Sequence, residues 1–239
     1  MNRENMLDGQ VALITGSSRG IGLAIARRLG QMGARVSLCA RKAADLESAA
    51  SDLRAAGIQV LARQVDVTRS DEVASLVSET QRTLGPIDIL INNAGIGIFG
   101  PFHEQTDLDW NAVLDTNLKS AFLTSRAVAP EMIRRKSGYI IQISSLAGKS
   151  TFANGAIYCA SKWGLLGLCG CMAEELRVHG IRVSAICPGS VATDFSPHAG
   201  KDASKMLQPE DVAHAVAALV TQAAGSFISE IQIRPTQKP

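Results

Sequence analysis

The chain alternates short apolar runs with longer stretches of helical periodicity along nearly its whole length. The apolar runs, such as "QVALIT", "ARVSLCA" and "IRVSAICPG", are nearly continuous rather than interrupted by a polar residue at every second position. Near-continuous apolar strands are typical of parallel sheets that helices cover on both faces. Strands separated by helices predict βαβ units with right-handed crossovers. We therefore expect an α/β fold, a doubly wound Rossmann-type three-layer sandwich with a mostly or wholly parallel seven-stranded sheet.

The expected elements follow one another without a linker, repeat or low-complexity segment. The strands are expected at residues 10–15, 34–40, 58–67, 87–95, 138–145, 181–189 and 228–234. The helices are expected at 21–33, 43–57, 70–85, about 107–135, about 156–179 and about 209–224. We therefore expect a single domain over residues 1–239.

Charge and cysteine content restrict the class of protein. The 24 basic and 22 acidic residues leave a formal net charge of +2, which argues against nucleic acid or an anionic membrane as the main partner. The five cysteines are odd in number and form no C-x-x-C pair, so we interpret them as small buried residues of a reducing compartment. The chain shows no signal peptide and no apolar run of about 18 residues, which predicts a cytoplasmic protein without a membrane span.

A glycine-rich loop, "TGSSRGIG", lies between the first strand and the first helix. Gly16, Gly20 and Gly22 would let the backbone turn sharply and approach a pyrophosphate, and the helix N-terminus would add amide donors. The spacing G-x-x-x-G-x-G differs from the common G-x-G-x-x-G fingerprint, and three glycines alone could form only a tight turn. The strand before and the helix after favour dinucleotide binding.

The end of the second strand indicates which dinucleotide binds. A carboxylate that would hold the adenosine ribose hydroxyls is missing there, and "ARK" places Arg41 and Lys42 at this position. Asp45 comes too late and belongs to the next helix. A guanidinium favours binding of a 2′-phosphate, so we expect NADP(H) as the cofactor and NAD(H) as the less favoured choice. Arg19 is a second candidate ligand for this phosphate. The alternative is that Arg41 and Lys42 only begin a solvated helix.

Polar and small residues also follow the later strands. Asp66 and Val67 end the third strand, "NNAG" the fourth, and Ser144 and Ser145 the fifth. Thirteen residues after Ser145 comes "YCASK", which puts Tyr158 and Lys162 on one face of a helix. Such a pair could be solvated, but its place in a doubly wound fold puts it near the carboxyl ends of the strands, where ligands bind.

Six motifs together resemble the short-chain dehydrogenase/reductase family. They are "TGSSRGIG", "NNAG", "DTNLKS", "ISSLAG", "YCASK" and "PGSVAT", and they cover nearly the whole chain in the family's order. Each is weak alone, and together they are specific. Within the family the chain looks like the 3-oxoacyl-(acyl-carrier-protein) reductase-like branch.

The resemblance implies roles for individual residues. The catalytic four would be Asn117, Ser145, Tyr158 as acid/base and Lys162, with Ser144 as the rival serine. The cofactor-binding residues would be Gly16, Ser18, Arg19, Gly20, Ile21, Gly22, Arg41, Asp66, Val67, Asn93, Ala94, Gly95, Tyr158, Lys162, Pro188, Gly189, Val191 and Thr193. The segment 194–208 would be a short substrate lid. The ending "ISEIQIRPTQKP" departs from the family's usual "VDGG"-like end, which leaves a homodimer or a homotetramer open.

These residues suit the reduction of a ketone or the oxidation of a secondary alcohol. A phenol of pKa about 10 is a slow base at neutral pH, and a neighbouring ammonium is expected to lower that pKa. Ser145 would stabilise the substrate oxygen, and Asn117 would hold a water that passes protons to Lys162.

The substrate itself stays open at this point. We expect Ile96, Phe99, Phe152 and Phe195 to form an apolar mouth for a small-molecule carbonyl substrate. The histidines lack metal-ligand spacing, so we expect no metal. The alternatives are a 3-oxoacyl-(acyl-carrier-protein) reductase, with Arg134, Arg135 and Lys136 as a docking patch, and a non-catalytic NADP-binding regulator.

Overall fold

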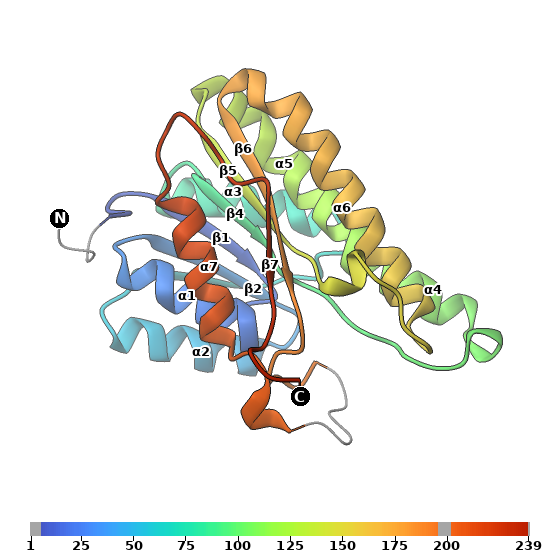
Figure 1. The fold of residues 1–239 in the computed structure, drawn as a ribbon. Coiled ribbons are helices and arrows are strands. Elements are labelled where there is room, and N and C mark those ends of the chain that lie inside the picture. The colour runs from blue at the N-terminus through green and yellow to red at the C-terminus, as the bar shows by residue number, and fades with distance from the viewer. Residues whose placement is uncertain (1–5, 196–201, 239) are drawn as a thin grey trace.

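The computed structural model describes residues 6–195 and 202–238. Seven strands in this part of the chain form one sheet, in the order β3-β2-β1-β4-β5-β6-β7 (Figure 1). Every neighbouring pair runs parallel. The strands are β1 (Val11–Thr15), β2 (Arg35–Ala40), β3 (Val60–Gln64), β4 (Ile89–Asn92), β5 (Gly138–Ile143), β6 (Ile181–Pro188) and β7 (Glu230–Ile233). The expectation of a wholly parallel doubly wound sheet is confirmed.

Helices cover both faces of the sheet. The helices are α1 (Gly20–Gln31), α2 (Ala43–Ala55), α3 (Ser70–Leu84), α4 (Asp107–Leu114), α5 (Ser120–Arg135), α6 (Ala156–Leu176) and α7 (Pro209–Val220). Helix α1 packs between α2 and α7 on one face, while α3, α5 and α6 lie on the other (Figure 1). The result is the three-layer sandwich that the sequence predicts.

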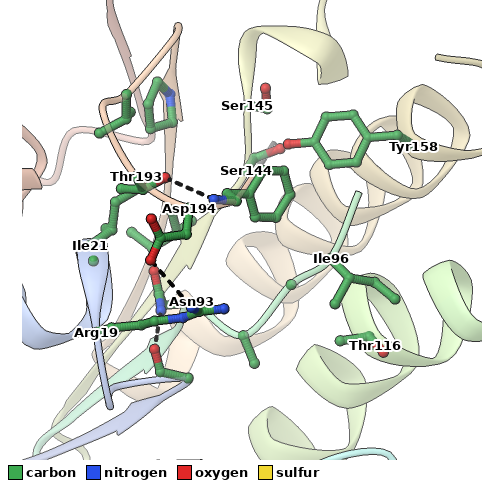
Figure 2. A pocket seen from close by; sticks show the side chains of 18 of the residues that line it. Arg19, Ile21, Asn93, Ile96, Thr116, Ser144, Ser145, Tyr158, Thr193 and Asp194 are labelled. Atoms are coloured by element: carbon green, nitrogen blue, oxygen red, sulfur yellow. Dashed lines mark hydrogen bonds and ion pairs between the residues drawn. The ribbon is translucent and has the colours of Figure 1, made fainter. Parts of the chain in front are cut away.

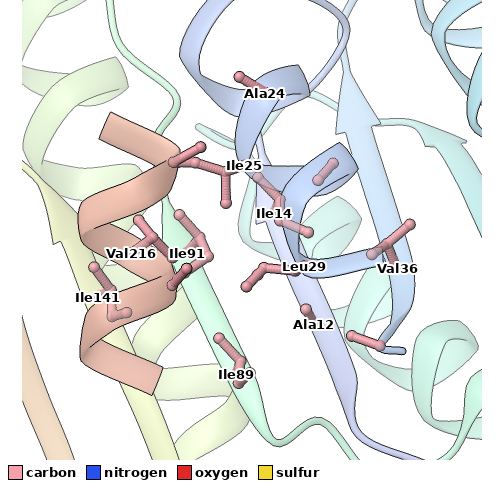
Figure 3. Packing of buried hydrophobic residues seen from close by; sticks show 14 of the residues in the cluster. Ala12, Ile14, Ala24, Ile25, Leu29, Val36, Ile89, Ile91, Ile141 and Val216 are labelled. Carbon is pink, nitrogen blue, oxygen red and sulfur yellow. The ribbon is translucent and has the colours of Figure 1, made fainter. Parts of the chain in front are cut away.

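The strands divide their side chains between two cores because successive residues of a strand point to opposite faces. In β1, Ala12 and Ile14 pack under α1, whereas Val11 and Leu13 pack under the helices of the other face. Figure 3 shows the first of these cores, where Ile25 of α1 and Val216 of α7 meet the central strands. Both faces of the sheet are therefore buried, which explains the near-continuous apolar runs.

The helix expected at about 107–135 is interrupted. A π-helical turn, Asp115–Lys119, separates α4 from α5. The sequence analysis did not predict this interruption, and π turns often mark functional sites. Asn117 lies in this turn.

Among the described residues, one helical stretch, Ala156–His179, is long and apolar enough to cross a membrane by length and composition alone, with 24 residues and a mean hydropathy of 1.3. Core helices pass the same test, and α6 packs against β6 and the turn after β5. One cysteine expectation is wrong: Cys171 on α6 is exposed, whereas Cys39, Cys159, Cys169 and Cys187 are buried and free.

The sheet order creates a crevice where ligands are expected to bind. Strands β1 and β4 are neighbours, and the chain leaves them toward opposite faces, so the carboxyl ends of these strands lie at a topological switch point. The loops after the central strands meet at this edge. Of the expected lid at 194–208, residues 196–201 lie outside the described residues, and the part at Leu207 makes a bridge to Val191.

Candidate active site

A cavity of about 1260 Å³ lies at the carboxyl ends of the strands. The loops that follow β1 to β6 all contribute side chains to it, so it extends across the switch point. Figure 2 shows the glycine loop and Arg19 on one side of this cavity and Tyr158 on the other. A single site can therefore hold an elongated ligand and a second, smaller one.

The glycine loop is shaped for close approach of an anion. Gly16 has φ +63°, and a Cβ there would lie 2.8 Å from the Ala94 Cα. A Cβ on Gly22 would lie 2.4 Å from the Gly16 carbonyl oxygen, so this glycine packs the helix against the loop and does not line the cavity. Helix α1 begins after Arg19, whose side chain does not cap it, and its first turn has no acidic residue. Uncapped amides at a helix N-terminus attract a phosphate, so these residues fit a dinucleotide.

Residues at the end of β4 hold this loop in place. The Asn93 side-chain amide donates to the backbone oxygens of Thr15 at 3.0 Å and Gly16 at 2.9 Å. The Thr15 hydroxyl accepts from the backbone N–H groups of Asn93 and Ala94, each at 3.0 Å. The neighbouring Asn92 instead turns to α5, where its amide donates to the Ser125 hydroxyl at 2.9 Å. Asn93 therefore ties β4 to β1, and Asn92 ties β4 to α5.

Charged side chains gather at one end of the cavity. Arg41 and Lys42 line it just after β2, and Asp45 lines it as well, although it belongs to the first turn of α2. Burial raises the pKa of Asp66, but hydrogen bonds from Thr68 and the charges of Arg41 and Arg69 outweigh it and keep that pKa low. Arg19 crosses the cavity to pair with Asp194 at 3.2 Å (Figure 2).

The other end of the cavity brings together two serines, a phenol and an ammonium. Tyr158 on α6 directs its hydroxyl toward Ser144 and Ser145 at the end of β5 (Figure 2). Ser144 is buried and lies 3.4 Å from the Lys162 carbonyl oxygen, while Ser145 makes a side-chain hydrogen bond to Tyr158. Lys162 is 4% exposed, and its Nζ donates to the Ile143 carbonyl oxygen at 3.0 Å.

Burial decides the pKa values of this pair. It raises the pKa of Tyr158 to about 12, against the hydrogen bond from Ser145, which lowers it. Burial lowers the pKa of Lys162 to about 8. The expectation that the ammonium lowers the phenol pKa is therefore wrong for this structure, because Nζ lies 5.9 Å from the Tyr158 ring centre and burial is the larger effect. The phenol is neutral at pH 7 and can donate a proton.

The protein without ligand should therefore show less than half of its tyrosines ionised at pH 10, the ordinary pKa of this side chain. Tyr139, the other of the two tyrosines, also has a raised pKa because it is buried. A pH titration of the near-ultraviolet phenolate absorbance measures this directly. Half of the phenolate signal already present at pH 10 would contradict the account, and the unfolded chain in denaturant serves as the control.

Asn117 does not line the cavity. Its Oδ1 accepts from the Ile96 N–H at 2.8 Å, and its Nδ2 donates to the Ile96 carbonyl oxygen at 2.9 Å and to the Ser161 hydroxyl at 3.0 Å. The side chain therefore holds the loop after β4 against α6. These bonds hold the loop at Ile96 in place, and the role of Asn117 in holding a relay water stays a prediction.

Every predicted site residue except Gly22 and Asn117 lines the cavity. The four candidate substrate residues, Ile96, Phe99, Phe152 and Phe195, are among the lining residues. Both rival serines line it too. The structure thus brings the predicted site together without assigning a role to each residue.

The family follows from comparison with known proteins. The model of the family described as short chain dehydrogenase matches residues 10–204. The chain belongs to the short-chain dehydrogenase family. It is therefore an oxidoreductase by family.

Several members of this family are similar to this chain along most of their length. The ketoacyl reductase HetN of a Nostoc species is 38% identical over 214 residues, which cover 88% of this chain and 75% of that protein. A metagenomic short-chain oxidoreductase solved in complex with NADP is 47% identical, with a TM-score of 0.87 over 97% of this chain and 99% of that one. A variant of the actinorhodin polyketide ketoreductase, solved with NADPH, is 34% identical, with a TM-score of 0.88 over 95% of this chain and 96% of that one.

Sequence reasoning missed part of this short-chain dehydrogenase site. Thr116, Leu146 and Ala192 also line the cavity, and small or apolar residues of this kind carry no sequence signal. Lys149, at the end of the turn that begins after Ser145, pairs with Glu230 of β7 at 2.6 Å. Gly189 donates its N–H to the Ile233 carbonyl oxygen at 2.8 Å. The C-terminal strand therefore supports two loops of the site.

Proposed function

We propose that this chain is an NADP(H)-dependent carbonyl reductase or alcohol dehydrogenase in which Tyr158 is the acid/base. The single observation that carries this proposal is the meeting of Tyr158, Ser145 and Lys162 at one end of a cavity whose other end is the glycine loop. NADP and NADPH in the two similar structures support the choice of cofactor. The ketoacyl reductase and ketoreductase names of similar proteins support a carbonyl substrate.

The proposed reaction joins a hydride to carbon and a proton to oxygen. When bound, NADPH would supply the hydride for the carbonyl carbon and become NADP⁺. Tyr158 gives its phenolic proton to the carbonyl oxygen, which yields the alcohol, and solvent restores that proton. Ser145 donates a hydrogen bond that stabilises the charge developing on this oxygen. A phenol with a pKa of about 12 is protonated at pH 7 and thus ready for reduction.

Lys162 and Asn117 act around this centre in the proposal. The buried Lys162 ammonium lies 5.9 Å from the centre of the Tyr158 ring and would hold the cofactor ribose, so it positions the ligand and the proton path. Asn117 fixes the loop at Ile96, which forms one wall of the cavity. Gly22 and Asn93 keep the glycine loop in the shape that the pyrophosphate needs.

Arg41 is proposed to bind the 2′-phosphate of NADP(H). Replacing Arg41 with Asp should weaken NADPH binding by about 10- to 100-fold, because a charge-assisted contact is lost and a like charge is added, while NADH binding should improve. Dissociation constants measured by cofactor fluorescence check this. Arg134→Asp, which changes the same charge at the other edge of the sheet, is the control. A wild-type protein that prefers NADH would overturn the assignment of Arg41.

The carrier-protein alternative has less support from the surface. Arg134, Arg135 and Lys136 close α5 just before β5 begins, so this patch lies at the edge opposite the cavity. Arg134 pairs with Glu131, and Arg135 pairs with Asp88 at 2.7 Å. These guanidinium groups hold the helix end in place. We therefore propose that the substrate is a free small molecule.

Self-association stays a prediction. We expect the helices at residues 107–135 and 156–179 to form the interface, as in the family that the chain resembles. They carry an apolar groove lined by Leu114, Leu118, Phe122, Gly164 and Leu168. Phe122 and Trp163 on these helices are exposed, which favours a second copy as the partner. Sedimentation or light scattering would distinguish a monomer from the expected homodimer or homotetramer.

A screen of NADPH oxidation over ketones, diketones and acyl thioesters tests the proposed function. We expect turnover with at least one ketone and one alcohol formed per NADPH consumed. Turnover of acyl thioesters alone would favour the 3-oxoacyl reductase instead. Tight NADPH binding without any turnover would favour the non-catalytic regulator.

A further inference from the structure

Three phenylalanines from three different loops form a group of aromatic rings beside Tyr158. The Phe99 ring lies 5.4 Å from it in an edge-on arrangement, and the Phe195 ring lies 5.7 Å from it. Phe152 extends the group, with its ring 6.0 Å from that of Phe99. The loops come from the ends of β4, β5 and β6, so the group depends on the whole fold and forms a wall of the cavity.

The outer rings of this group are available to a ligand. Phe152 is 50% exposed and Phe195 is 40% exposed, whereas Tyr158 is 7% exposed. Large apolar side chains that gather at the mouth of a cavity indicate that something apolar binds against them. Their exposure beside the proposed acid/base therefore points to the substrate.

Glycines fix how closely these rings approach the backbone. A Cβ on Gly97 would lie 2.5 Å from the Phe99 ring and 3.1 Å from the Phe195 ring. A Cβ on Gly155 would lie 2.5 Å from the Phe152 ring. Phe99 and Phe152 therefore pack against main chain where only a glycine leaves room for the ring.

Charge at this end of the cavity is scarce. Arg19, Arg41, Lys42, Asp45 and Asp66 belong to the cofactor end, and Asp194 beside Phe195 is paired with Arg19. The Lys162 ammonium is directed at the Ile143 carbonyl oxygen. Among the described residues that line the phenylalanine end, no guanidinium or ammonium faces a substrate carboxylate or phosphate. A neutral substrate suits these surroundings, because charged groups here would lose hydration without a partner.

We propose that Phe99, Phe152 and Phe195 form an aromatic clamp that selects neutral ketones bearing an aromatic ring on the carbonyl carbon. The inference rests on the proposed function and names its substrate class. The substrate ring packs against the clamp, which places the carbonyl oxygen at Tyr158 and Ser145. Aromatic rings gain from tilted and edge-on contacts beyond the area they bury, and a rigid ring loses less conformational freedom than an alkyl chain.

A matched pair of methyl ketones tests the clamp. Phenyl methyl ketone and cyclohexyl methyl ketone are similar in size and differ in aromaticity. We expect the wild type to favour the phenyl compound by roughly tenfold in kcat/KM, as expected for two additional ring contacts. Phe152→Leu and Phe195→Leu should each reduce this preference several-fold, and cofactor fluorescence shows whether each variant still binds NADPH. Phe122→Leu, on α5 and away from the cavity, should leave the preference unchanged.

The outcomes separate the clamp from the proposed function. Reduction of both ketones with equal kcat/KM, or a preference that neither Leu variant changes, would overturn the clamp and leave the reductase intact. Failure to reduce any ketone while NADPH binds would overturn both. Thermal unfolding of each variant shows whether it is folded, and two independent Leu variants keep the test decisive if one is not.

Discussion

Tyr158→Phe is expected to lower kcat/KM for ketone reduction by about 10³-fold, because the variant keeps the ring and loses the proton donor. NADPH affinity and the free energy of unfolding should change little, since the phenyl ring still packs against Phe99. Steady-state kinetics, cofactor fluorescence and denaturant titration measure the three quantities.

Tyr139→Phe provides the matched control, because Tyr139 is the other tyrosine of the chain. Its hydroxyl lies 2.8 Å from the Ser184 hydroxyl and accepts from the Gln222 amide at 2.7 Å, beneath α7 and far from the cavity. We expect this variant to lose about 1–2 kcal/mol of stability and to keep its activity, as buried partners become unsatisfied. Equal activity in Tyr158→Phe and the wild type would refute the role of Tyr158.

Lys162→Met is expected to reduce activity and raise stability at the same time. Activity should fall by about 100-fold, because the ammonium that positions the ligand and the proton path is gone. Burial lowers the pKa of Lys162 from 10.5 to about 8, a difference that corresponds to a cost of roughly 3 kcal/mol for the charged form. The lost hydrogen bond to Ile143 offsets about 1 kcal/mol of this, so we expect a gain of about 2 kcal/mol at pH 7.

This gain should depend on pH in a defined direction. Below pH 8 the lysine is charged in both the folded and the unfolded protein, so its full burial cost is present. Between pH 8 and pH 10.5 the folded lysine loses its proton first, so the cost and the advantage of methionine should disappear. Denaturant titrations at pH 8 and pH 10.5 test this pH dependence. Lys205→Met is the control, because Lys205 is exposed and pairs with Asp202 at the surface. A variant less stable than the wild type at pH 7 would contradict the account.

The fold could be predicted because a doubly wound sheet leaves a strong pattern. Strands buried on both faces must be apolar throughout, as Val11–Thr15 and Ile181–Pro188 are, and their ends fix where ligands bind. The glycine loop and the Tyr158–Lys162 pair could be located for the same reason. Each follows a recognisable strand, so its place in the fold is known before its contacts are.

The contacts themselves could not be predicted, because they depend on how deeply each side chain is buried and on the distances between side chains. The direction of the Tyr158 pKa change depends on its burial, which the pattern "YCASK" does not contain. Asn117 lies in a π turn, and the partners of its three side-chain hydrogen bonds come from the loop after β4 and from α6, far away in the sequence. Asp45 lines the cavity from within α2, although its sequence position suggests only a helix start.

The central claim is that this chain transfers a hydride between NADPH and a carbonyl carbon with Tyr158 as the proton donor. The most direct measurement uses NADPH deuterated at its hydride-donating carbon, with phenyl methyl ketone as substrate and mass spectrometry of the alcohol. The account predicts one deuterium on the carbinol carbon of each alcohol from the wild-type protein, and almost no alcohol from Tyr158→Phe. Bound NADPH without labelled alcohol from any ketone would contradict it.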